Sequence, residues 1–98
     1  MKKVLIIDTS ILCVYLRVPG KETCGSKGNK WNKIQVDEKL KKEEEAKTTF
    51  VLPLATIIET GNHIAQVSTK RYKIAKKLAI LMKLTADNQT PWAAFIEP

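Results

Sequence analysis

Four consecutive large apolar residues near the start of the chain, Val4 to Ile7, are followed at once by a carboxylate, Asp8. A strand without polar alternation is typical of a parallel sheet, because helices cover both of its faces. We therefore predict a buried strand over 4–7 and a helix through "ILCVYLR" that is capped by Thr9 or Ser10. Asp8 then lies at the carboxyl end of a strand, where open α/β sheets bind their ligands.

The rest of the chain continues this alternation of strand and helix. We predict one further strand over 49–56 and helices over 34–47, 57–66, 69–84 and 92–97, with a flexible basic loop over 20–33. The helix over 34–47 is mostly Lys and Glu, so we expect it at the surface. This order predicts a single α/β domain over 1–98, with a parallel sheet flanked by helices.

Two strands do not complete a parallel sheet, because parallel pairs are stable only with covered faces and usually with several neighbours. The sequence therefore predicts an incomplete domain that lacks its last strands. An incomplete sheet has exposed edges, which favour self-association or another chain that completes the domain.

Composition limits the class of protein. The chain has 98 residues, of which 44% are hydrophobic and 28% are charged, as in a small globular domain. Its apolar runs are far shorter than the roughly 20 residues that a membrane span needs, so we expect no membrane partner and a cytoplasmic protein. Cys13 and Cys24 form no CxxC pair, and the chain contains a single histidine. Reduced thiols are therefore expected rather than a zinc site or disulfides.

The net charge of +7 is concentrated in one stretch, since residues 60–86 contain six Lys or Arg and no Asp or Glu. A basic stretch favours a polyanionic partner, because phosphate neutralisation releases counterions. A solvated helix face would explain the same lysines. On the first interpretation, Lys70, Lys73, Lys76 and Lys77 are candidate contacts to RNA phosphates.

Two acids follow the two predicted strands, Asp8 after the first and Glu59 just after the second. If the strands are adjacent and parallel, both carboxylates open into one crevice, where a divalent cation would offset their repulsion. Ligands that are oxygen only favour Mg²⁺ or Mn²⁺ over Zn²⁺. A structural alternative exists for each acid: Asp8 as a local cap, and Thr56 with Glu59 as a capping box.

A polar stripe extends from Glu59 along the helix predicted after it. Asn62, His63 and Gln66 follow Glu59 at helical spacing, which places them on one face. Asn62 and His63 are candidate substrate contacts, although an ordinary exposed helix face would also be polar.

Two segments resemble the first two motifs of PIN-domain ribonucleases, "VLIIDTSILCVYLR" and "FVLPLATIIETGNHIAQ". The resemblance implies a PIN-like fold and a metal-dependent endonuclease of RNA, in which acids bind Mg²⁺ or Mn²⁺ and a metal-activated water attacks the phosphodiester. By position, Asp8 and Glu59 match the first two catalytic acids. Thr9 or Ser10 matches the hydroxyl beside the first acid, and Thr56 matches the threonine that leads into the second motif.

The sequence also departs from that family. Family members carry further aspartates after a third strand, and neither Asp87 nor Glu97 is a persuasive substitute. Two interpretations therefore stay open. The first is a ribonuclease, either the toxin of a toxin-antitoxin pair with an antitoxin partner or an RNA-processing enzyme. The second is a catalytically inactive α/β module that binds nucleic acid or protein, which would be indifferent to metal.

Overall fold

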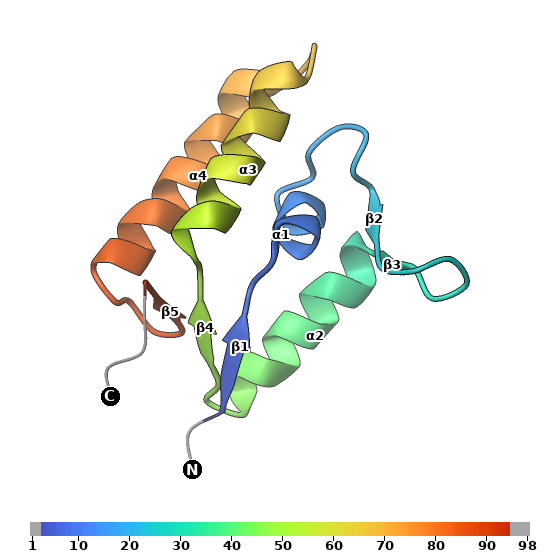
Figure 1. Cartoon of the computed structure of the whole chain (residues 1–98). Coiled ribbons are helices and arrows are strands. Elements are labelled where there is room, and N and C mark those ends of the chain that lie inside the picture. The colour runs from blue at the N-terminus through green and yellow to red at the C-terminus, as the bar shows by residue number, and fades with distance from the viewer. Residues whose placement is uncertain (1–2, 95–98) are drawn as a thin grey trace.

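The computed structural model describes residues 3–94 of the chain (Figure 1). The elements in chain order are β1 (Val4–Ile6), α1 (Thr9–Tyr15), β2 (Thr23–Cys24), β3 (Trp31–Asn32), α2 (Lys33–Glu45), β4 (Thr49–Val51), α3 (Leu54–Gln66), α4 (Arg71–Ala86) and β5 (Trp92–Ala93). Within the described range, no helix is both long enough and apolar enough to cross a membrane.

The main sheet has three parallel strands in the order β1-β4-β5, so the predicted α/β class with a parallel sheet is confirmed. The register pairs Val4 with Thr49 and Phe50 with Trp92. Because β1 and β4 are adjacent and parallel, their carboxyl ends lie at the same edge of the sheet. This is the arrangement that the sequence required for Asp8 and Glu59 to meet.

The third strand corrects two predictions. Trp92 and Ala93 were expected to begin a helix over 92–97, and only two strands were expected in the chain; both expectations are wrong. The reason is pairing with β4: the Phe50 amide donates to the Pro91 carbonyl at 2.7 Å, and the Trp92 ring packs edge-on against Phe50 at 5.4 Å. These contacts outweigh the local helix signal of Thr90-Pro91. The rest of that predicted helix, including Glu97, lies outside the described residues.

One hydrophobic core connects the sheet with all four helices. Side chains from β4 and the residues that follow β1 and β4 pack against α1, α2, α3 and α4; among the most buried are Ile7, Leu12, Val36, Phe50, Leu52, Ile64 and Leu78. Helix α3 lies beside both α1 and α4 (Figure 1). The start of α1 and the first turns of α3 are therefore held together at the carboxyl edge of the sheet.

The segment predicted as a flexible basic loop over 20–33 contains a two-stranded ribbon. Strand β2 pairs antiparallel with β3, which places Cys24 opposite Trp31. Asn32 then caps α2 in a capping box with Gln35. Secondary structure thus replaces part of the expected loop, while the mobility of the segment stays a prediction.

Candidate functional site

Asp8 caps α1. Its backbone is extended, and its Oδ1 accepts a hydrogen bond from the Ile11 amide at 2.8 Å. The prediction that Thr9 or Ser10 caps this helix is wrong, because the extended backbone of Asp8 already directs a side-chain oxygen at the free amides of the first turn. Within residues 3–94, Oδ2 of this exposed carboxylate accepts no hydrogen bond, so capping leaves one oxygen for another ligand.

Thr9 connects the Asp8 turn to Glu59. The Thr9 hydroxyl donates to Glu59 Oε2 at 2.8 Å, across 50 positions of sequence. Thr9 is the next residue after Asp8, and Glu59 lies in the second turn of α3. The structure therefore brings the second acid to the turn that holds the first.

The expected capping box of Thr56 and Glu59 is absent, because α3 begins at Leu54 with Pro53 as its N-cap residue and no side-chain cap bond. Thr56 is buried inside the helix, and its hydroxyl donates to the Ile7 carbonyl at 3.0 Å. That bond fixes α3 to the end of β1. Glu59 is thus free of the structural role that the sequence offered for it.

Like most acids in the described range, the two candidate ligands have no ion-pair partner there, although the chain has a net charge of +7. Within residues 3–94, neither Asp8 nor Glu59 forms an ion pair; the acids that do are Asp37, Glu43 and Asp87. From the described part of the chain, Asp8 and Glu59 receive hydrogen bonds only from a neutral amide and a neutral hydroxyl. Their negative charge is left for a group outside this part of the chain.

The donor set fits a hard divalent cation. Among residues 3–94, no group of three or more His, Cys, Asp or Glu side chains is placed to hold a metal, so a closed site made by protein alone is not built there. Mg²⁺ instead commonly binds through one or two carboxylates, with waters and substrate phosphates as its other ligands. Asp8 Oδ2 and Glu59 Oε1 are the oxygens that could serve, since each has its partner oxygen in a hydrogen bond.

The predicted substrate contacts on α3 make no contact with the two acids within residues 3–94. His63 and Gln66 line a shallow hollow with Pro19 and Lys21, which follow the far end of α1. Asp8 lies at the other end of α1, and a helix of this length spans roughly 10 Å, since the rise is ~1.5 Å per residue. The hollow is therefore separated from Asp8 by the length of the helix. Exposed Asn62 has no contact with either acid among the interactions of the described range.

The predicted lysine contacts are also remote. Lys70 precedes α4 and lines a hollow with Arg17 and Lys33, again near the far end of α1. The others, Lys73, Lys76 and Lys77, are exposed along α4. Within residues 3–94 no contact joins these lysines to Asp8 or Glu59, and their role as contacts to RNA phosphates stays a prediction.

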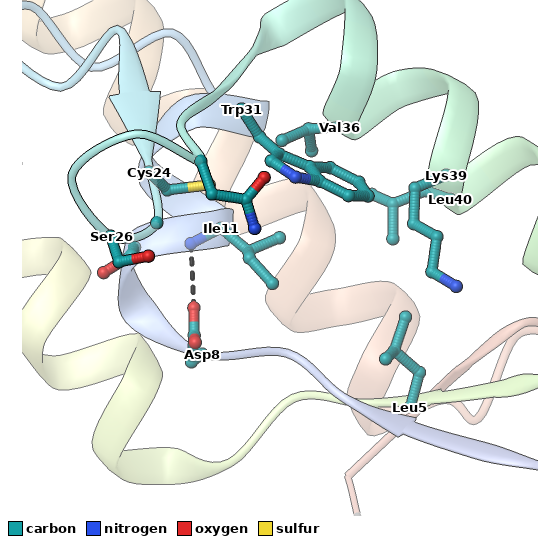
Figure 2. Close-up of a pocket in the computed structure, with 12 residues that line it drawn as sticks. Leu5, Asp8, Ile11, Cys24, Ser26, Trp31, Val36, Lys39 and Leu40 are labelled. Atoms are coloured by element: carbon teal, nitrogen blue, oxygen red, sulfur yellow. Dashed lines mark hydrogen bonds between the residues drawn. The ribbon is translucent and has the colours of Figure 1, made fainter.

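A cavity of about 470 Å³ adjoins Asp8 (Figure 2). It lies between β1, the start of α1, the β2–β3 ribbon and α2, and Ser10 also lines it. Burial raises the pKa of the Cys24 thiol, and the negative charge of Asp8 raises that pKa further, so the thiol at the cavity wall is neutral. Both Cys13 and Cys24 are free cysteines.

Sequence reasoning missed the residues of this cavity. Ser26, Asn29, Trp31 and Lys39 all line it, although the first three fall in the segment expected to be a loop. The available signal was a Gly25-x-x-Gly28 turn placed just before an isolated tryptophan, a pattern typical of a short hairpin.

Comparisons with known proteins give no family for the chain. No family model, no curated protein and no solved structure matches it. The resemblance to PIN-domain ribonucleases therefore rests on two short motifs and stays a prediction.

Proposed function

We propose that the protein is a PIN-like endoribonuclease that depends on Mg²⁺ or Mn²⁺, with Asp8 and Glu59 as its metal ligands. The observation that carries the proposal is the hydrogen bond from Thr9 to Glu59, because it joins the start of α1 to α3, the helices that follow the parallel strands β1 and β4, and so brings Glu59 to the turn that holds Asp8. A role as the toxin of a toxin-antitoxin pair belongs to the same proposal and rests on the family resemblance.

Each residue of the site has a distinct task. Asp8 and Glu59 present one free oxygen each to the cation, which when bound supplies positive charge to the phosphodiester and makes a water more acidic. Thr9 is a positioning residue, since its hydroxyl fixes the Glu59 carboxylate. Thr56 holds the first turn of α3 against the end of β1, so the spacing of the two acids does not depend on a loop.

An inactive binding module is the weaker interpretation. Capping of α1 would account for Asp8 in a module that only binds nucleic acid or protein, but it gives no reason for the exposed Glu59 to be bonded to the residue after Asp8. Like charges in proximity raise the free energy unless an opposite charge compensates them. A divalent cation held by Asp8 and Glu59 would supply that compensation.

Cleavage of single-stranded RNA by the full chain in Mg²⁺ or Mn²⁺ tests the proposal. We expect Asp8→Asn and Glu59→Gln each to reduce the cleavage rate by about 100-fold or more, as for other groups that act directly in the reaction. Glu45→Gln is the matched control, because Glu45 is an exposed acid on α2 and forms no ion pair within residues 3–94. We expect that variant to cleave at the wild-type rate.

A thermal shift with Mn²⁺ separates loss of metal from loss of fold. Wild-type protein should gain thermal stability as Mn²⁺ rises above its dissociation constant, because the ion binds only the folded state. Asp8→Asn should melt at the wild-type temperature without metal and show no gain with it. RNA cleavage that survives both substitutions, or that is equally fast in a chelator, would contradict the proposal.

A further inference from the structure

We infer that the cavity beside Asp8 binds an unpaired nucleobase of single-stranded RNA, stacked on the indole of Trp31. This inference rests on the proposed function, since it names the substrate feature that the same site recognises. Its evidence is separate, because it comes from the β2–β3 ribbon and α2 rather than from the two acids.

The cavity has the size and lining of a site for a flat, largely apolar ring. Its volume of about 470 Å³ lies within the range of small-ligand sites. Val36 and Leu40 of α2 are buried beneath it, and Ile11 of α1 and Leu5 of β1 line its other sides. Such walls bury the faces of a base while leaving its polar edge to be bound elsewhere.

Trp31 supplies the aromatic surface. It is half-buried, and its position is fixed by pairing with Cys24 across the ribbon and by the start of α2 immediately after it. Figure 2 shows the indole above Ile11, with Val36 and Leu40 to one side. An indole held in this way is a stacking platform for a base that is not paired in a duplex.

The ribbon turn supplies polar groups for the edge of the base. The Asn29 amide donates to the Ser26 carbonyl at 2.9 Å, which closes the turn and leaves both side chains exposed beside the cavity. Gly25 has a φ of +102°, and a Cβ there would lie 2.6 Å from the Asn29 carbonyl oxygen, so only glycine fits. The backbone of the turn is thus fixed, and it carries the Asn29 side-chain amide and the Ser26 hydroxyl at the edge of the cavity.

Charge and position favour RNA over a neutral ligand. Lys27 and Lys30 are exposed on the ribbon, whereas Lys39, which lines the cavity on the α2 side, is already paired with Glu43. Asp8 lies at the opposite side of Ile11 from Trp31 in Figure 2 and is bonded to the Ile11 amide. A base in the cavity would therefore place its own phosphodiester near Asp8, the candidate metal ligand that lines the cavity.

Fluorescence anisotropy with a labelled 12-nucleotide single-stranded RNA in EDTA tests the inference without cleavage. We expect Trp31→Ala to raise the Kd by about 10- to 100-fold, the usual effect of removing one stacking aromatic. Trp31→Phe should stay within about 3-fold of wild type, since the smaller ring still stacks and the ribbon is preserved. Tyr72→Ala is the matched control, because Tyr72 is an aromatic residue on α4 that is 82% exposed.

A change on the RNA side removes any doubt about folding. A series of strands with a single abasic position should contain one position at which wild-type protein loses a similar factor in affinity, whereas Trp31→Ala should no longer distinguish that strand. Equal binding of every abasic strand, together with unchanged binding by Trp31→Ala, would overturn the inference and indicate contacts to phosphates alone.

The two proposals fail in distinguishable ways. Metal-dependent cleavage that requires Asp8 but ignores Trp31 and the abasic positions would leave the ribonuclease and remove the base site. Base-dependent binding through Trp31 without cleavage under any metal would keep the base site and remove the ribonuclease.

Discussion

Glu43 differs from Asp8 and Glu59 in both burial and ion pairing. Glu43 on α2 is only 5% exposed and pairs with Lys39 and Lys3, each at 3.0 Å, while the Thr48 hydroxyl donates to it at 3.1 Å. Asp8 and Glu59 are exposed, and within residues 3–94 they receive hydrogen bonds from neutral groups alone. The chain has 17 Lys and Arg, yet two of them surround one buried glutamate and neither candidate ligand has one in the described range.

The difference separates an acid that the fold requires from acids that it does not. A buried carboxylate is costly unless it is paired and hydrogen-bonded, so its partners must come from the protein itself. Hydrogen bonds from Lys39 and then Lys3 lower the pKa of Glu43 to about 2, against the effect of burial. Asp8 and Glu59 lack such compensation, which is what a site that binds a cation from solution needs before the cation arrives.

Replacement of glutamate by glutamine should change folding stability much more at Glu43 than at Glu59. Glu43→Gln removes the charge that two lysines contact and leaves them near a neutral amide, so it should lower the free energy of unfolding well below the wild-type value. Glu59→Gln removes one exposed acceptor and should leave that free energy nearly unchanged. Urea denaturation followed by far-UV circular dichroism measures both.

Mn²⁺ binding by the same two variants checks the proposed role of each acid. Glu43→Gln, once folded, should retain Mn²⁺ binding, whereas Glu59→Gln should lose it. If Glu59→Gln were the more destabilising of the two, the Thr9–Glu59 bond would be a structural element of the fold, and the comparison would collapse.

Low pH should destabilise the folded protein through protonation of Glu43. The pKa of Glu43 is about 2 in the folded protein, whereas the ordinary value for a glutamate side chain is 4.5. Between pH 2 and pH 4.5 the folded state therefore binds fewer protons than the unfolded state. The resulting stabilisation is fully present above pH 4.5 and is lost as the pH falls from 4.5 toward 2. Urea midpoints measured from pH 7 to pH 2 should decline over that interval.

Glu43→Gln is the control for this titration, because it removes the group that titrates. Its urea midpoint should start lower at pH 7 and decline less steeply between pH 4.5 and pH 2. Parallel curves for the variant and wild type would assign the acid sensitivity to other carboxylates.

The sequence predicted the position of the candidate site better than its surroundings. Asp8 and Glu59 follow apolar strands, and parallel pairing of those strands was enough to place them at one edge of the sheet. Their alternative explanations differed in outcome for a local reason: Asp8 does cap α1, whereas Pro53 begins α3 too early for Thr56 to cap it.

The errors arose where contacts distant in sequence decide the structure. Trp92 joins the sheet because β4 and the Phe50 ring are there to receive it, and the local Thr90-Pro91 signal contains none of that information. Glu43 read as one acid of an exposed Lys-Glu helix, yet Lys3 and Thr48 from outside that helix bury it. Helix and strand propensities reflect only the local sequence, whereas contacts with residues distant in sequence determine the secondary structure of Trp92 and the burial of Glu43.

The smallest expected effect lies at Asp8, where capping and metal binding can be separated. Asp8→Ala removes the hydrogen bond to the Ile11 amide and should lower the free energy of unfolding by about 1 kcal/mol, whereas Asp8→Asn keeps an acceptor and should change it by only a few tenths. Both variants should lose the thermal gain from Mn²⁺, because an amide is a poor substitute for a carboxylate ligand. Urea denaturation without metal, paired with thermal melts in Mn²⁺, measures the two properties on the same samples. If Asp8→Asn kept its response to Mn²⁺, the helix cap would be the whole role of Asp8, and the contrast with Glu43 would be one of burial alone.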